Sequence, residues 1–217
     1  MTYDDLRLLI DYNYWARDRV LDAVATITPE QFIRPMGNSF TSVRDTVAHI
    51  CAAERIWITR LKGENPQGLQ KPDRLRDVDA ARKEWAELEG EMRDQLVRLG
   101  PEAVGLTIEY QDLRGNDQSD VLWQMLQHVV NHGTYHRGQI TTMLRQLDAA
   151  PPKSMDLIAF FASEIGRLDQ VSTGRTQNVR RVRRALRYPA ISELANAAWL
   201  LVRRQADSIP SKYCKAA

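Results

Sequence analysis

Hydrophobic side chains recur every three or four residues over long stretches of the chain, a spacing that places them on one face of an α-helix. The first stretch predicts a helix from about residue 3 to residue 27, which Thr28-Pro29 ends. The Ser39–Ser42 segment offers capping side chains to a second helix that runs to about Leu61. A third, highly charged helix is expected over about residues 78–99, and its charges are interpreted as a solvated face.

The second half of the chain contains one short interruption of this pattern. Residues 107–110 alternate well enough for a strand, and residues 113–117 are typical of a turn, so a small hairpin or extended loop is expected there. Helical spacing then extends over residues 118–147, and it returns over residues 155–168 after the Pro151-Pro152 break. Because strands and helices do not alternate along the chain, an all-α helical bundle is favoured over a parallel α/β fold.

Composition places the chain among ordinary globular proteins. Of its 217 residues, 43% are hydrophobic and 27% are charged, unlike a disordered chain. The two cysteines, Cys51 and Cys214, are too few for a disulfide framework and favour a reducing compartment. The acidic N-terminus lacks an apolar secretory region, and no stretch approaches the roughly 18 apolar residues of a membrane span. We therefore expect a cytoplasmic protein with no membrane partner.

The net charge of +2 hides two parts of opposite sign. Residues 1–167 carry 20 Lys and Arg against 25 Asp and Glu, a net of −5, whereas residues 168–217 carry 10 against 3, a net of +7. We expect a main domain over 1–167 and a basic helical extension over 168–217, with helical patterns at 178–187 and 191–204. The extension is interpreted as an arm that packs on the acidic body or on a partner subunit. Contact with nucleic acid or an acidic membrane surface is the alternative, and no other part of the chain predicts nucleic-acid binding.

The histidines are distributed unevenly. His128, His132 and His136 are four residues apart on the longest expected helix, and His49, the fourth, lies on another. At about 100° per residue the three rings lie within about 80° of one another, on a face that also carries hydrophobic side chains. An unpaired polar ring there costs about 1–3 kcal/mol, which either a shared metal ion or ordinary hydrogen bonds would remove. The four-residue spacing suits two ligands of one ion, and His49 remains for a third. The metalloprotease motif HExxH is absent, because Gly133 follows His132.

Three short runs resemble the DinB family of the DinB/YfiT-like metalloprotein superfamily. They are Tyr-Asn-Tyr-Trp-Ala at 12–16, Ser-Val-Arg-Asp-Thr-Val-Ala-His-Ile at 42–50, and His-Val-Val-Asn-His-Gly-Thr-Tyr-His-Arg-Gly-Gln-Ile at 128–140. The resemblance covers about residues 1–167 and implies a four-helix bundle that binds a divalent metal. It implies one ligand from the second helix and two from the HxxxH pair, which here are His49, His132 and His136.

Several neighbours of these residues also receive an interpretation. His128, one turn before the pair, is interpreted as a residue that supports a ligand, as an alternate ligand or as part of the cavity wall. Gln139 is expected to hydrogen-bond a ligand imidazole, and Arg137 to pair with a carboxylate or cap a loop. Gly138, a poor helix former, is expected to mark a close approach of two helices.

Aromatic and thiol side chains are given structural roles. Trp15, Trp57 and Trp123 are expected to anchor the core or a dimer interface. Cys51 lies two residues from His49 but about 200° around the same helix, so we expect a packed thiol rather than a catalytic one. The sequence therefore identifies no catalytic base or nucleophile of its own.

Three histidine nitrogens would leave open positions on an ion, the arrangement of a catalytic metal site. Histidine nitrogen suits zinc, nickel, copper and iron alike, and of these zinc and nickel are the expected ions. Relatives in the superfamily include transferases and isomerases that use bacillithiol, mycothiol or glutathione. The resemblance thus implies a metal-dependent transferase that joins a low-molecular-weight thiol to a small electrophilic substrate, with a hydrolase as the related alternative. A non-catalytic, metal-stapled interaction or stress-response module, in keeping with the family's damage-inducible name, is the alternative from another class. Resemblance to dimeric relatives implies a homodimer.

Overall fold

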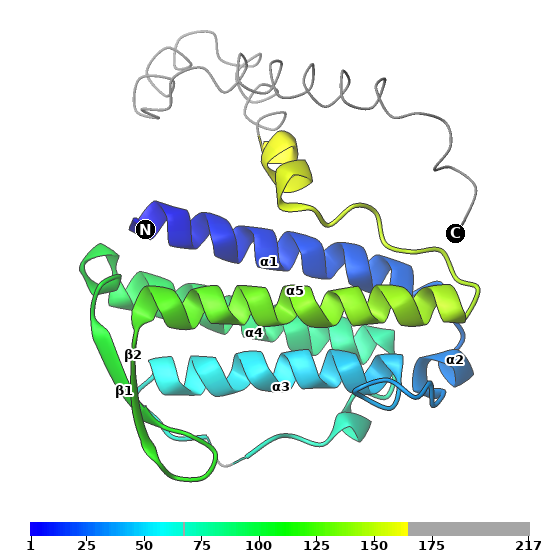
Figure 1. The fold of residues 1–217 in the computed structure, drawn as a ribbon, viewed down its shortest axis with the longest axis horizontal. Helices are drawn as coiled ribbons and strands as arrows, with labels where there is room; N and C mark the ends of the chain where they lie inside the picture. The colour runs from blue at the N-terminus through cyan, green and yellow to red at the C-terminus, as the bar shows by residue number, and fades with distance from the viewer. Residues whose placement is uncertain (67, 165–217) are drawn as a thin grey trace, which may run out of the picture. The chain divides into compact units, whose positions relative to one another are not determined.

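The structure, a computed structural model, describes residues 1–66 and 68–164 and is mostly helical (Figure 1). Its α-helices are α1 (Tyr3–Val24), α2 (Pro29–Ile33), α3 (Val43–Leu61), α4 (Val78–Leu99) and α5 (Leu122–Gln146), and residues 157–164 are also helical. Strands β1 (Thr107–Gln111) and β2 (Asp117–Val121) form an antiparallel pair between α4 and α5, and short 3₁₀ helices lie at Pro72–Arg74 and Pro101–Ala103. None of the described helices combines the length and apolar character needed to cross a membrane. The expected all-α class is confirmed.

The predicted hairpin is confirmed, but the predicted start of the following helix is wrong. Residues 118–121 were expected in the helix, yet they belong to β2, where Val121 pairs with Thr107 and Gln118 with Tyr110. Pairing with β1 satisfies their backbone groups before α5 begins, although Val121 also fits the helical spacing of the residues that follow.

The last expected helix is confirmed as far as the structure describes it. Residues 157–164 are helical, two residues later than the predicted start. The end of that helix, the boundary expected at 167/168, Cys214 and the helical patterns at 178–187 and 191–204 all lie outside the described residues.

Side-chain caps determine where the helices begin. At the start of α1, the Asp5 backbone N–H donates to the Thr2 hydroxyl while the Asp5 carboxylate accepts from the Thr2 N–H, which closes a capping box. Thr28 and Gln31 form the same arrangement at the start of α2. The Thr28-Pro29 break therefore begins a short helix as well as ending the first one, which the hydrophobic pattern did not predict. Ser42 caps α3 as expected.

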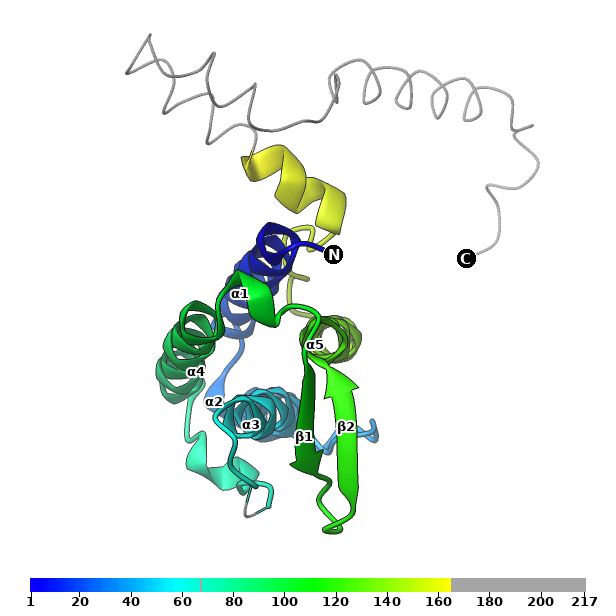
Figure 2. The same cartoon turned by 90° about the vertical axis from the view of Figure 1, so that its left-hand side faces the viewer.

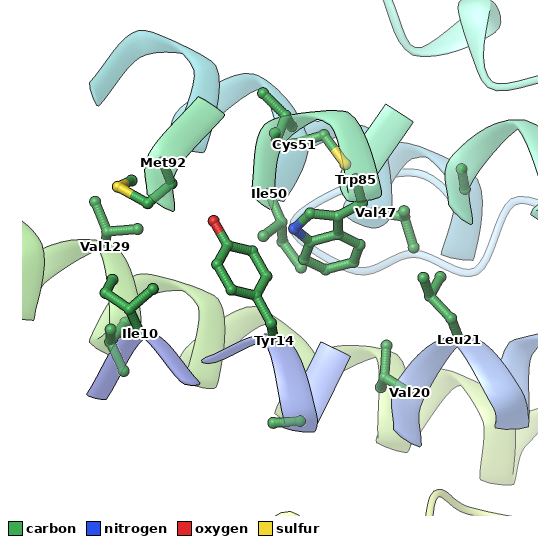
Figure 3. Packing of buried hydrophobic residues seen from close by; sticks show 14 of the residues in the cluster. Ile10, Tyr14, Val20, Leu21, Val47, Ile50, Cys51, Trp85, Met92 and Val129 are labelled. Atoms are coloured by element: carbon green, nitrogen blue, oxygen red, sulfur yellow. The ribbon is translucent and has the colours of Figure 1, made fainter. Parts of the chain in front are cut away.

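Four helices pack in a ring around one core. α1 contacts α5, α5 contacts α3, α3 contacts α4, and α4 contacts α1, which Figure 2 shows end-on. Figure 3 shows the centre, where Tyr14 of α1 and Trp85 of α4 extend toward each other among aliphatic side chains from α1, α3 and α5. Because each helix buries one apolar face here, the ring holds α3 and α5 side by side, and these are the two helices that carry histidines.

The tryptophans differ in burial. Trp15, Trp57 and Trp123 are partly buried and pack against the edge of the core, as expected of core anchors. Trp85, on the helix whose charges were expected to face solvent, is completely buried. The charged face of α4 is therefore only one side of that helix. A role of Trp15, Trp57 and Trp123 in a dimer interface stays a prediction.

Candidate metal centre

α3 and α5 bring three histidine rings together. His49 lies on α3, and His132 and His136 lie one turn apart on α5. The Nε2 atom of His49 is 3.0 Å from Nε2 of His132, and one nitrogen from each of the three rings lies within 4.8 Å of the other two. Since a zinc–imidazole bond is about 2.0–2.1 Å long, nitrogens this close can share one ion. The structure thus groups the three residues that the family resemblance implied as ligands.

Phe40 covers one side of this group. Its ring stacks on His49 with the ring centroids 4.1 Å apart and the planes 24° apart. The same ring meets His136 edge-on at 5.4 Å. Phe40 lies in the loop before α3, where hydrophobic periodicity has no meaning, so the sequence analysis missed it. The available signal was an aromatic residue shortly before the cap of a helix that carries a histidine.

Gln139 orients His136. The His136 Nδ1–H donates to the Gln139 Oε1 atom at 2.7 Å, and the Gln139 Nε2 atom donates to the Ser39 hydroxyl at 3.1 Å. With Nδ1 as the donor, the lone pair of His136 is on Nε2. The expected hydrogen bond from Gln139 to a histidine of the group is therefore present, and it ties α5 to the loop that carries Phe40.

Burial keeps the three imidazoles neutral. Burial, followed by the neighbouring His136, lowers the pKa of His49 to about 4. Burial, followed by the neighbouring His136 and His49, lowers the pKa of His132 to about 3. The pKa of His136 is also lowered by burial, an effect that its hydrogen bond with Gln139 opposes. Near neutral pH the group presents uncharged nitrogens, the form in which histidine binds metals.

His128 and Cys51 lie outside the group. The His128 ring is 5.9 Å from the His132 ring and 5.2 Å from the Trp57 ring, so it lies beside the group, and it is exposed. Cys51 is completely buried, and burial raises the pKa of its thiol well above the usual range. Among the described residues, no cysteine or carboxylate joins the three histidines. The interpretation of Cys51 as a packed thiol agrees with its burial.

A buried polar network lies beside the ligand-bearing turn of α5. The Arg137 Nη1 atom donates to Asn13 Oδ1 at 2.7 Å, and Asn13 Nδ2 donates to Glu54 Oε1 at 2.9 Å. Arg137, which was expected to pair with a carboxylate or cap a loop, is linked to the Glu54 carboxylate through Asn13, which lies between the two charged groups. Burial raises the pKa of Glu54, and its hydrogen bond with Asn13 acts against this. Glu54 was missed, although it lies seven residues after Val47 on the apolar stripe of α3.

The close approach of two helices expected at Gly138 is absent, and the crowded glycine of α5 is Gly133. A Cβ atom at Gly133 would lie 2.8 Å from Arg137 Nη1 and 2.9 Å from Asn13 Oδ1, whereas one at Gly138 would have nothing within 4 Å. The prediction for Gly138 is wrong because crowding around α5 comes from the polar network and not from a neighbouring backbone.

Comparison with known proteins identifies a family and relatives that this chain resembles. The model of the DinB family matches residues 1–168. Protein DinB of Bacillus subtilis (strain 168) is 28% identical over 163 residues, which cover 70% of this chain and 92% of that relative. A crystal structure of a DinB-like protein from Bacillus cereus ATCC 10987 has a TM-score of 0.50 and 14% identity over 67% of this chain and 95% of its own, a likeness of fold. The family model matches most of this chain, and the three histidines lie together between two helices. This chain therefore belongs to the DinB family.

Proposed function

We propose that the chain is a divalent-metal-dependent enzyme whose ion is held by His49, His132 and His136. The observation that carries this proposal is the convergence of three imidazoles from two packed helices. Because no other protein ligand joins them within the described part of the chain, an ion held there would keep positions for an external ligand, as catalytic zinc sites do.

The donor set fits zinc or nickel. Neutral imidazole nitrogen suits these ions, whereas magnesium and calcium prefer oxygen ligands. When bound, the ion would supply Lewis acidity that lowers the pKa of a thiol or of water. The chain supplies the positioning, since Gln139 fixes the ring of His136 and Phe40 shields one face of His49 from water.

We further propose that the external ligand is a low-molecular-weight thiol and that the reaction transfers it to a small electrophile. The reaction class is the one that the resemblance to the DinB/YfiT-like superfamily implies, and the match to the DinB family supports that resemblance. In such a transfer the thiolate sulfur bonds to the electrophilic carbon, the leaving group departs with its electron pair, and the thiol proton passes to solvent. An external nucleophile is consistent with the burial of Cys51, whose thiol is inaccessible.

Cobalt(II) gives this proposal a spectroscopic test. We would load the full chain with cobalt(II), add bacillithiol, mycothiol or glutathione in turn, and record the visible and near-ultraviolet spectrum. The proposal predicts a thiolate-to-cobalt absorption band with at least one thiol, and consumption of that thiol when an alkyl chloride is supplied. His128→Ala should retain both signals and His132→Ala should lose both. A cobalt spectrum that no thiol changes, with no thiol consumed, would contradict the transferase and favour a metal-stapled module.

A further inference from the structure

A second concave surface lies on the side of α5 away from the histidines. It is a groove of about 700 Å³ between α1, α5 and residues 151–157. At about 100° per residue, the residues of α5 that line it lie about 140° to 260° around the helix from His132. The Tyr12 hydroxyl donates to the Met155 carbonyl at 2.9 Å, which holds the segment after α5 against α1. This segment forms one wall of the groove. The groove is therefore separate from the metal centre.

Gly138 opens this groove. It lines the groove in the interior of α5, and a Cβ atom there would meet nothing within 4 Å. A glycine inside a helix is destabilising relative to alanine, and no neighbouring backbone requires one at this position. What the missing side chain provides is space along the wall of the groove.

The charged groups of the groove are mainly cationic. Arg137, Arg145 and Lys153 line it, against a single carboxylate, that of Asp156. Arg137 is only 1% exposed, it donates hydrogen bonds to the uncharged side chains of Asn13 and Thr134, and the charge of Glu54 acts on it only at longer range. No ion pair in the described part of the chain includes Arg137. A buried cation without a direct carboxylate partner favours an anion beside it.

Part of the remaining wall is apolar, and uncharged polar side chains such as Asn131 and Thr141 line the rest. Leu9 and Tyr12 of α1, Val130 of α5, and Met155 and Leu157 after α5 line the same groove. We propose that the groove binds a small amphipathic anion, with an apolar body against these side chains and a carboxylate or sulfonate beside Arg137, Arg145 and Lys153. Small-molecule sites combine an apolar lining with a few polar groups in this way.

Charge argues against the chain's own C-terminal segment as the occupant. Residues 168–217 carry 10 Lys and Arg against 3 Asp and Glu. A segment of that sign would bring further cations to a cationic groove, whereas a small anion complements it.

The test uses two fluorescent probes that differ in one group. 8-Anilinonaphthalene-1-sulfonate carries an aromatic body and a sulfonate, and N-phenyl-1-naphthylamine is its uncharged counterpart. We expect the full chain to bind the sulfonate more tightly. Gly138→Leu, which fills the groove with a good helix former, should abolish binding of both probes while thermal unfolding shows a folded protein.

Charge variants separate this groove from general surface binding. Arg145→Gln with Lys153→Gln should weaken binding of the sulfonate about fivefold, as expected for two partly exposed ion pairs, and should leave the neutral probe unchanged. Arg114→Gln, an exposed cation in the hairpin turn, is the control and should change neither affinity. Absence of sulfonate binding to the full chain, or equal binding by wild type and Gly138→Leu, would overturn the proposal.

Discussion

Gly133 of α5 lies against the buried polar network formed by Arg137 and Asn13. Arg137 Nη1 and Asn13 Oδ1 both lie within 3.0 Å of where its Cβ atom would be. Arg137 is 1% exposed and Asn13 is fully buried, so neither side chain has room to move away. Although alanine is the better helix former, a methyl group here would break or displace the Arg137–Asn13 hydrogen bond.

We therefore expect Gly133→Ala to lower the free energy of unfolding by about 1–3 kcal/mol, the range for an overpacked buried site. Gly138→Ala, five residues later on the same helix, has open space and should raise it by about 0.5–1 kcal/mol. Urea unfolding of the two variants measures both values. Equal effects of the two substitutions would contradict the crowding described at Gly133.

At the scale of single residues, the sequence was enough to predict which histidines lie together but not which residues surround them. The spacing of His132 and His136 is local, so helical geometry alone places them on one face. Phe40 and Glu54 act through contacts between elements, with His49 and Asn13 respectively, and no local pattern reports such contacts. Whether the three histidines bind an ion stays a prediction.

α3 carries His49 and depends on Ser42, the residue that caps its start. The Ser42 hydroxyl accepts a hydrogen bond from the Asp45 N–H at 3.1 Å, and Ser42 is completely buried. Asp77 caps α4 in the same way, accepting from Ala80 N–H at 2.7 Å, but α4 carries no histidine. The Asp77 cap therefore serves as a control for the Ser42 cap, because only the helix that Ser42 caps carries a residue of the metal centre.

Ser42→Ala and Asp77→Ala should each lower the free energy of unfolding by about 1 kcal/mol, the usual cost of losing a side-chain cap. Only Ser42→Ala should also weaken zinc binding, because it loosens the first turns of the helix that positions His49. Competition with a chromogenic zinc chelator gives the two affinities. A zinc affinity that falls equally in both variants would show that the start of α3 has no particular role in the site.

At the scale of elements, long amphipathic segments were predictable and short ones were not. α1, α3 and α4 follow from hydrophobic spacing with capping or breaking residues at their ends. α2 is only a turn or two long and depends on the capping box at Thr28, and the first residues predicted for α5 pair with β1 instead. In both cases hydrogen bonds to backbone groups determine the structure, and the spacing of hydrophobic residues does not predict such bonds.

The stability of the whole molecule should depend on pH through its partly buried histidines. The pKa of His49 is about 4 and that of His132 about 3, whereas an exposed histidine has a pKa of 6.5. As pH falls below 6.5, the unfolded chain takes up protons that the folded chain does not hold until about pH 4 and 3, so the metal-free protein loses stability over this range. Glu54 acts in the opposite direction, because burial raises its pKa.

Urea unfolding of chelator-treated protein, followed between about pH 7 and about pH 5, measures this dependence. His132→Gln removes one of the depressed histidines and leaves Glu54 in place. The wild type should therefore lose more stability over the interval than the variant does. Parallel curves for the two proteins would mean that His132 is not held neutral by burial.

The metal content of the full chain tests the central claim most directly. We would equilibrate wild type and single alanine variants of His49, His132, His136 and His128 with zinc or nickel, remove free ion by gel filtration, and measure bound metal by elemental analysis. The three-histidine site predicts about one ion per chain in wild type and in His128→Ala, and its loss from each of the other variants while circular dichroism shows them folded. A wild type that retains no ion, or variants of all three grouped histidines that keep it, would contradict the site.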